Sequence, residues 1–447
     1  MHRRLPFLLA ILLPGTWLAG AAAGAVKPPS VDPNRIINES YNFLKEREPE
    51  MTDDEYALYE RVIPMAKDRP EFALRILETM VADEKEESAA FEFALANVYY
   101  TQDRHADAEA HFRKAIERYP QYQRAWLSLG TLYYVTSRFE QAVDCYGRAI
   151  ALGDREAQTL GLLGYSLYST GNPLAAEMAY MQAMAADPKN PDWIGAVINL
   201  LIDNREYTRA EPLARRLVVL RPRESGSWNL LAGVLAALGR KPDACAQLEL
   251  ASTLGVVDAD GVALLGDLYF EQGFVAEASE VYKRLAQLSP AIGLARQLTC
   301  VQASIAEGRV GEAARAFASI PAPQEGEDRA RYLQVRAQVR IAEADTPAAR
   351  QDLLEVLALE PLNGWALVTL GDSYKDEGDD TRAEFYFGEA TRVAEFAYRA
   401  HLELANACLR ARRFAASVTH LEAALALEKS PELQRHLAQV RLLVESP

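Results

Sequence analysis

The sequence predicts an all-α protein built from about ten repeated pairs of antiparallel helices. The first observation is a 34-residue period, in which Leu129-Gly130 matches Leu163-Gly164 and Tyr146 matches Tyr180. The second is that apolar residues within each period recur every three or four positions, as on amphipathic helices. The third is a turn signal between the two helical halves, such as "STGNP" or "EQG". A single pair cannot bury its own apolar faces, so successive pairs are expected to stack around one continuous core.

The first 25 residues differ from the rest of the chain. Arg3 and Arg4 precede a short apolar run and small residues in A-x-A spacing. Together these features predict a secretory signal peptide over residues 1–25, cleaved near Ala21 to Ala25. A lipoprotein signal would have Cys where Ala21 stands, so we expect no lipid anchor. The predicted location is therefore periplasmic or secreted.

The repeats predict the boundaries of the remaining regions. Residues 26–88 form an N-terminal helical extension with a degenerate repeat, in which "DPNRIINESYNFL", "TDDEYALYERVIPMA" and "RPEFALRILETMV" each predict a helix. Six contiguous units fill residues 89–292, with starts at 89, 123, 157, 191, 225 and 259. A degenerate unit and the insertion "IPAPQEGED" fill residues 293–329. Three further units, starting at 330, 364 and 398, fill residues 330–431, and a capping helix covers residues 432–447.

Small residues at fixed repeat positions predict close helix packing. A small residue follows a large one in the first helix of most units, and an alanine recurs in the second helix. We expect these small residues to let the paired helices approach each other. The first-helix set is Gly130, Gly164, Ala232, Gly266 and Gly371.

The four cysteines, Cys145, Cys245, Cys300 and Cys408, fall in different repeats. A disulfide needs Cα atoms within about 7 Å, whereas units two repeats apart are separated by much more. We therefore expect no disulfides and mostly buried thiols.

Composition excludes several classes of function. The formal net charge of −15 argues against nucleic acid and anionic membrane surfaces as partners. No run after the signal peptide is long and apolar enough to predict an integral membrane segment. No catalytic, nucleotide-binding or zinc motif is present, and His105 and His111 have the wrong spacing for a helical zinc pair. We expect no enzyme activity, cofactor or metal.

The multi-position pattern, repeated in ten registers, resembles the tetratricopeptide repeat family. The resemblance implies a right-handed α-solenoid whose first helices line a concave groove. It also implies that positions 2, 5, 9, 12 and 13 of each unit face the groove, while positions 4, 7, 8 and 11 are core. Helical periodicity supports this division independently, because the two sets of positions form separate stripes.

The implied groove stripe of the first four units is rich in aromatic and amide side chains. Such residues suit peptide recognition, because they combine rigid apolar faces with hydroxyl and amide groups. The same aromatic residues could instead pack between adjacent repeats, and the sequence leaves both readings open. Tyr133, at position 11, is assigned to the core, and its neighbour Tyr134 to the groove. The candidate binding residues are Phe93, Asn97, Tyr100, Arg124, Leu127, Tyr134, Tyr165, Tyr168 and Asn199.

The sequence therefore predicts a non-enzymatic periplasmic scaffold that binds a protein or an extended peptide in its concave groove. A role as an accessory to an envelope machine fits this prediction. Few Lys or Arg residues lie at groove positions, which argues against a clamp for a terminal carboxylate. Two alternatives stay open. The groove aromatics could stack on cell-wall glycan, or the solenoid could self-assemble end to end.

Overall fold

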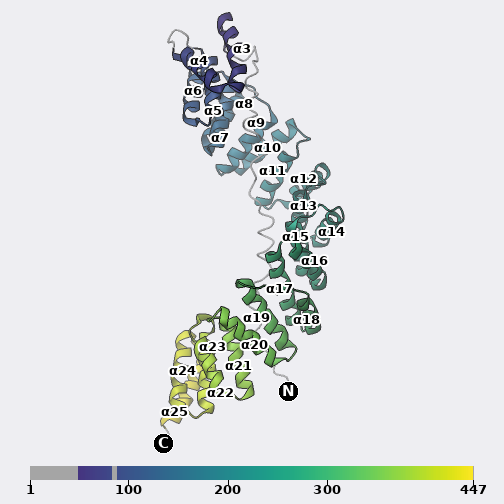
Figure 1. The fold of residues 1–447 in the computed structure, drawn as a ribbon, viewed down its shortest axis with the longest axis vertical. Coiled ribbons are helices and arrows are strands. Elements are labelled where there is room, and N and C mark those ends of the chain that lie inside the picture. Colours follow the sequence, from purple (N-terminus) through teal and green to yellow (C-terminus); the bar gives the residue numbers. More distant parts are fainter. Residues whose placement is uncertain (1–48, 83–87, 446–447) are drawn as a thin grey trace. The chain divides into compact units, whose positions relative to one another are not determined.

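The computed structural model describes residues 49–82 and 88–445, and their regular structure comprises 23 helices without a strand (Figure 1). These residues divide into two compact units. We call residues 49–257 the N-terminal unit and residues 258–445 the C-terminal unit. The signal peptide and the helix predicted from "DPNRIINESYNFL" lie outside the described residues. The predicted α-solenoid of antiparallel helix pairs is confirmed.

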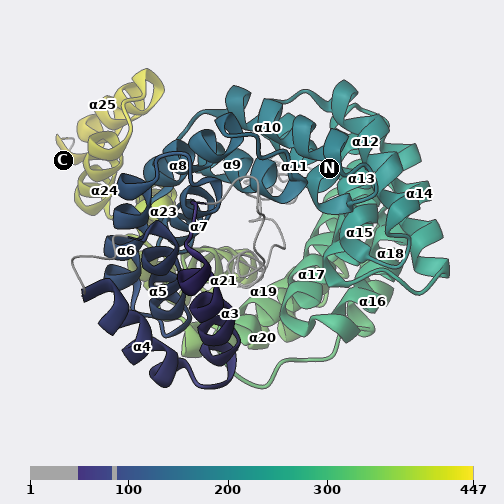
Figure 2. The same cartoon turned by 90° about the horizontal axis from the view of Figure 1, so that it is seen from above.

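The N-terminal unit consists of consecutive helix pairs, with short turns between their helices. Its first helices α5, α7, α9, α11 and α13 begin at the predicted residues 89, 123, 157, 191 and 225. Within this unit these odd-numbered helices form the inner layer, and the even-numbered helices lie outside them (Figure 2). The helices are α3 (Asp53–Asp68), α4 (Pro70–Ala82), α5 (Ala89–Thr101), α6 (His105–Arg118), α7 (Gln123–Val135), α8 (Phe139–Ala151), α9 (Ala157–Ser169), α10 (Pro173–Ala186), α11 (Pro191–Asp203), α12 (Tyr207–Leu220), α13 (Ser225–Ala237) and α14 (Lys241–Thr253).

The C-terminal unit keeps the helix pairs but departs from the predicted frame. Three of its first helices, α17, α19 and α23, begin three or four residues before the predicted starts near 294, 330 and 398. Their preceding second helices include the two shortest, α18 and α22, with 9 and 11 residues. The helices are α15 (Ala259–Glu271), α16 (Val275–Leu288), α17 (Pro290–Ala306), α18 (Val310–Ala318), α19 (Glu327–Ala342), α20 (Thr346–Leu359), α21 (Gly364–Glu377), α22 (Asp380–Ala390), α23 (Ala394–Arg410), α24 (Phe414–Leu427) and α25 (Pro431–Glu445).

The repeated glycines have the predicted packing role. A Cβ atom built on Gly130 would lie 3.0 Å from the ring of Tyr146, which comes from the second helix of the same repeat. The corresponding distance is 2.3 Å between Gly266 and Tyr282. A larger side chain would therefore push the two helices of the pair apart.

Adjacent repeats are joined by an ion pair that the sequence analysis did not predict. Glu109 in α6 contacts Arg138, which stands 29 residues later at the start of α8, with 2.5 Å between Oε2 and Nη1. Glu211 and Arg240 repeat this spacing at 2.8 Å, and Glu384 and Arg413 also form a pair. The arrangement recurs because a 34-residue repeat returns the same two positions to the same junction.

All four cysteines are buried and none forms a disulfide, as expected from their distribution among the repeats. Burial raises the pKa of the Cys300 thiol to about 12. The thiolate, the reactive form, is therefore disfavoured.

Candidate functional site

The candidate residues of the first repeat are buried. Phe93 is fully buried on α5, and its ring centroid lies 5.8 Å from that of Phe112 and 4.9 Å from that of Tyr122. Tyr100 is also buried and packs against His105, with 5.7 Å between centroids. The structure thus places Phe93 in the core rather than on an open face. Helix α5 is apolar on all sides (AAFEFALANVYYT), so burial of both stripes is consistent with its sequence.

Asn97 is the exception among these apolar contacts. Its side chain is fully buried on α5, and neither its Oδ1 nor its Nδ2 has a hydrogen-bond partner among residues 49–82 and 88–445. An unsatisfied buried amide costs roughly 1–3 kcal/mol. Native structures seldom retain such a group without a reason.

Arg124 begins the stripe of the second repeat. It is mostly buried near the start of α7, and its guanidinium carbon lies 5.3 Å from the centroid of the Phe93 ring. This contact is a cation–π interaction between the first helices of two adjacent repeats. Leu127, one turn further along α7, is partly exposed.

Tyr134 and Tyr165 form an aromatic cluster with Phe139, a residue that the sequence analysis missed. The three ring centroids lie between 5.6 and 6.1 Å apart, in edge-to-face arrangements. Burial raises the pKa of the Tyr134 hydroxyl well above its ordinary value. Of the two readings left open, this geometry favours packing between repeats for Tyr134 and Tyr165. Phe139 could have been noticed as a large apolar residue at the start of a second helix.

The last stripe residues are more accessible. Tyr168 donates a hydrogen bond from its hydroxyl to Oδ2 of Asp203, at 2.9 Å, and this contact joins α9 to α11. Asn199 on α11 is partly exposed.

Tyr133 lies in the core, as predicted. It is 3% exposed, and the guanidinium carbon of Arg138 stands 4.4 Å from its ring centroid. Its hydroxyl donates to Glu109 at 3.0 Å and accepts a hydrogen bond from Arg113 at 2.8 Å. Tyr133 therefore belongs to the junction between repeats, and Tyr134 to the neighbouring aromatic cluster.

In one repeat of the C-terminal unit, that of α21, the equivalent stripe positions carry paired charges. Asp372 and Lys375 occupy positions 9 and 12 of their repeat and lie 3.0 Å apart. Lys375 also contacts Glu403 at 3.0 Å, and Arg399 contacts Asp372 at 2.5 Å. These groups satisfy one another across α21 and α23.

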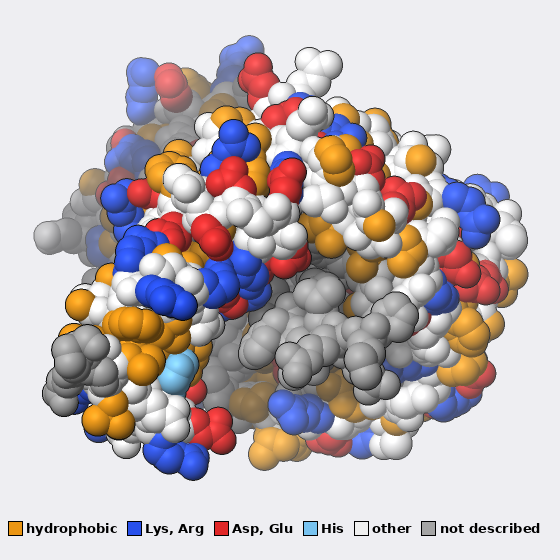
Figure 3. Space-filling view, turned by 90° about the horizontal axis from the view of Figure 1, so that it is seen from below, with side chains coloured by type: hydrophobic (Ala, Val, Ile, Leu, Met, Phe, Trp, Pro, Cys, Tyr) orange, Lys and Arg blue, Asp and Glu red, His pale blue; other side chains and the backbone are white. Residues whose placement is uncertain are grey.

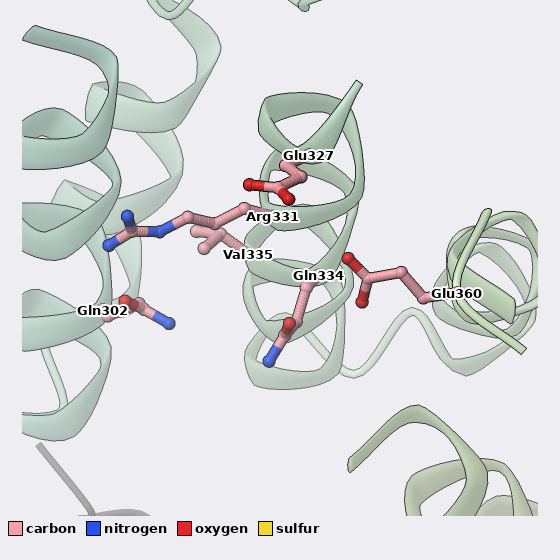
Figure 4. A pocket seen from close by; sticks show the side chains of 6 residues that line it. All are labelled: Gln302, Glu327, Arg331, Gln334, Val335 and Glu360. Carbon is pink, nitrogen blue, oxygen red and sulfur yellow. The ribbon is translucent and has the colours of Figure 1, made fainter. Parts of the chain in front are cut away.

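A polar pocket opens beside the first helices of the C-terminal unit. Its volume is about 440 Å³, and Figure 4 shows Arg331 extending towards α17 while Glu360 points towards Gln334. Arg331 reaches Thr299 at 3.4 Å, and Gln302 donates to Gln338 at 3.0 Å. Two of the lining residues, Arg331 and Gln302, thus already have polar contacts within the unit. The lining residues are Gln302, Glu327, Arg331, Gln334, Val335 and Glu360.

A family model for the tetratricopeptide repeat matches more than half of the sequence. The chain belongs to this family. Its members are in general protein-binding scaffolds rather than enzymes. The matched residues are 65–123, 93–140, 127–191, 198–255 and 368–433.

Individual proteins resemble parts of the chain. A cytochrome c-type biogenesis protein, CycH of Pseudomonas aeruginosa, is 25% identical over 127 residues, which are 28% of this chain and 31% of that protein. The match therefore spans about a third of the relative. The match to a chain in the structure of Naa15/Naa10 bound to HypK-THB covers 87% of this chain and 66% of that chain. Its sequence identity is 16% and its TM-score is 0.44. The match to the structure of a tetratricopeptide repeat protein from Parabacteroides merdae covers 52% of this chain and 93% of that protein. Its sequence identity is 17% and its TM-score is 0.36.

Surface properties add three observations. Basic and acidic side chains lie interspersed on the face seen in Figure 3. No helix in the described part of the chain is both long and apolar enough to cross a membrane. Over residues 49–82 and 88–445, no group of three or more His, Cys, Asp or Glu side chains could hold a metal ion.

Proposed function

We propose that this chain is a non-enzymatic periplasmic adaptor, which binds an extended peptide segment of a partner protein along the inner layer of its N-terminal unit. The observation that carries the proposal is the unpaired, fully buried amide of Asn97. It occupies position 9 of a first helix, in the stripe that the family resemblance assigns to ligand binding.

The chemistry of an amide side chain matches that of a peptide backbone. A backbone carbonyl can accept from Nδ2, and a backbone N–H can donate to Oδ1, so one peptide group could satisfy both atoms of Asn97. The unpaired amide destabilises the free protein, and hydrogen bonds to a bound peptide would remove this free-energy penalty. Recognition of backbone groups would also favour an extended segment over a folded surface.

The relatives support the same class of function. Family members act in general as protein-binding scaffolds. The partial match to a cytochrome c-type biogenesis protein supports a role in assembling another protein. We propose a protein client for that reason, in preference to a glycan.

The binding proposal is tested with one amide in each unit. Proteins retained by the purified chain from envelope extract would be identified, and synthetic peptides covering them would be titrated against it. We expect Asn97→Leu to weaken the best peptide at least tenfold, about 1.4 kcal/mol. Asn406→Leu is the matched control, because Asn406 is also at position 9 but is exposed in the C-terminal unit.

Stability measurements separate binding from misfolding. Because Asn97→Leu removes an unpaired buried amide, we expect its thermal midpoint to equal or exceed that of the wild type. Equal peptide affinity in both proteins would contradict the proposal, as would retention on purified peptidoglycan without a protein partner. The location is tested by N-terminal sequencing of the protein from periplasmic extract, where we expect a start just after Ala21, Ala23 or Ala25.

A further inference from the structure

Two histidines face each other in the last repeat of the C-terminal unit. His401 on α23 and His420 on α24 have their Nδ1 atoms 3.2 Å apart, and their ring centroids are 5.5 Å apart. Both rings are partly exposed. Two neutral imidazoles can share such a contact only if one Nδ1 carries a proton and the other accepts it.

The repeat architecture explains why these residues meet. They occupy positions 4 and 23 of their unit, and the same two positions meet in the first unit as Glu92 and His111, 2.5 Å apart. Position 4 is elsewhere filled by residues such as Trp126 and Leu160. The last repeat is therefore the one complete unit in the described chain in which both positions carry histidine.

The two helices that carry the pair are fixed against each other. Ser417, three residues before His420, is fully buried and donates from Oγ to the carbonyl of Ala405 at 3.0 Å. Ala405 lies one turn after His401 on α23. This bond holds the two helices in register at the level of the histidines. The helices that carry the two rings are therefore already positioned before a ligand binds.

The separation of the nitrogens suits a shared metal ion. Zinc–imidazole bonds are about 2.0–2.1 Å long, so two such nitrogens lie about 3.4 Å apart at a tetrahedral angle and about 2.9 Å apart at a right angle. The observed 3.2 Å falls between these values. A small tilt of the two partly exposed rings would replace the direct contact between them with a bent bridge through a metal.

We propose that His401 and His420 form a two-histidine site for a borderline divalent transition-metal ion, such as Zn²⁺, Ni²⁺ or Cu²⁺. Imidazole is a preferred ligand for these ions. Water would complete the coordination, since the protein supplies two ligands. Nearby, Glu384 and Arg413 pair with each other, so their opposite charges largely offset at the site.

Binding requires a change of tautomer at one ring. The metal needs the lone pair of both Nδ1 atoms, so the histidine that carries its proton on Nδ1 must lose it to solvent and gain one on Nε2. The two transfers balance, and no net proton is released when neutral histidines bind. The exposed rings allow this exchange with water.

The site is tested by calorimetric titration of the untagged mature protein with Ni²⁺ and with Zn²⁺. We expect the wild type to bind one ion with micromolar affinity. Losing an outer-shell partner of a metal already costs about 10- to 100-fold in affinity, so losing a ligand should cost at least tenfold. His401→Ala and His420→Ala should each show this loss, while His436→Ala, outside the site on α25, should bind like the wild type.

Spectroscopy gives a second readout that a purely structural pair would not produce. With one equivalent of Cu²⁺, the electron paramagnetic resonance spectrum of the wild type should show coupling to two nitrogens, and that of His420→Gln to one fewer. Circular dichroism without metal checks that each variant is folded, and the glutamine variant keeps a polar group if the alanine variant does not fold. Equal metal affinity in the wild type and both alanine variants, or no binding by the wild type, would overturn the proposal.

Discussion

The two units present different chemistry at equivalent repeat positions. In the N-terminal unit, positions 9 and 12 of the first helices carry Asn97 and Tyr134, an unpaired amide and part of an aromatic cluster. In the repeat of the C-terminal unit that contains α21, the same positions carry Asp372 and Lys375, which are bound to each other and to neighbouring charges. A ligand must break existing contacts at Asp372 and Lys375, whereas at Asn97 it can satisfy an unmet group once it gains access to the buried amide. We therefore expect peptide binding in the N-terminal unit, whereas the charges of the α21 repeat already satisfy one another.

A related contrast, between individual repeats, appears in the core at positions 11 and 23. In the first repeat Tyr99 stacks on His111, with centroids 5.3 Å apart. In the unit that contains α19 and α20, the same positions carry Arg340 and Asp352, which lie 2.7 Å apart. Asp352 is 1% exposed and also accepts hydrogen bonds from Arg336.

The largest expected effect comes from breaking this buried charge cluster. Asp352→Ala would leave two arginines facing an apolar core without their carboxylate, and breaking a buried pair in this way costs about 3–5 kcal/mol. We expect the lower end of this range, because Arg336 and Arg340 are partly exposed and can turn to water. Urea unfolding followed by hydrogen exchange should locate the loss in the C-terminal unit.

A matched variant shows whether the charges themselves are needed. The next repeat has Leu370, Tyr374 and Tyr386 at positions 7, 11 and 23, and its two tyrosines stack at 5.6 Å. Transferring this set as Arg336→Leu, Arg340→Tyr and Asp352→Tyr should bring stability back to within about 1 kcal/mol of the wild type, because apolar replacements of buried ion clusters are often neutral. A triple variant as unstable as Asp352→Ala would show that the site cannot accept the packing of its neighbour.

Much of the fold could be predicted because the repeat signal is local. The starts of α5, α7, α9, α11, α13 and α15 follow from apolar spacing and turn residues within each period. The predicted helix starts differ from the observed ones after the short second helices α18 and α22. Phe396, for example, lies in an early turn of α23 and fills the space beside Gly364, where an added Cβ would lie 2.2 Å from its ring. That contact links two repeats, and no local pattern encodes it.

The candidate site was harder to predict than the fold. Periodicity placed Tyr133 in the core correctly, and it set Tyr134 on a different side of the helix, because one residue step turns a helix by about 100°. It could not show that Phe93 is buried, since that depends on the neighbours of α5. It also could not pair Glu109 with Arg138 or His401 with His420, because those contacts depend on how the two helices of a pair, or two adjacent repeats, align.

A smaller effect is expected where the two units differ in the tightness of helix packing. Gly266→Ala places a Cβ 2.3 Å from Tyr282, whose hydroxyl donates to Asp267 at 2.6 Å and is thereby held in place. Overpacking of this kind costs about 1–3 kcal/mol. Gly164→Ala in the N-terminal unit meets Tyr180 at 3.0 Å, and the hydroxyl of Tyr180 has no hydrogen-bond partner in the described part of the chain. The ring of Tyr180 can therefore give way more easily.

We expect Gly266→Ala to destabilise its unit clearly. For Gly164→Ala, the gain of about 1 kcal/mol from replacing glycine within a helix should offset most of the strain. Thermal unfolding of both variants measures the difference, with Gly147→Ala as control, because a Cβ at Gly147 would meet nothing within 4 Å. Equal losses at Gly266 and Gly164 would show that the anchored hydroxyl of Tyr282 does not stiffen the contact.

The smallest predicted effect concerns the acid sensitivity of the N-terminal unit. Burial alone would raise the pKa of Glu109, but hydrogen bonds from Arg138 and Tyr133 outweigh it and hold the pKa below its ordinary value. A carboxylate with a lowered folded-state pKa stabilises the protein above its unfolded pKa, near pH 4.5, and this contribution is lost as the pH falls through the folded value. Glu109→Gln should therefore reduce stability at neutral pH by less than about 1 kcal/mol, as for a partly exposed pair, and should flatten the loss of stability between neutral and acidic pH.

Urea unfolding at several pH values measures both effects, and Glu140→Gln on the exposed side of α8 is the control. If Glu109→Gln leaves the pH profile unchanged, the junction between the repeats does not depend on this charge, and the stacking of Arg138 on Tyr133 alone must hold it.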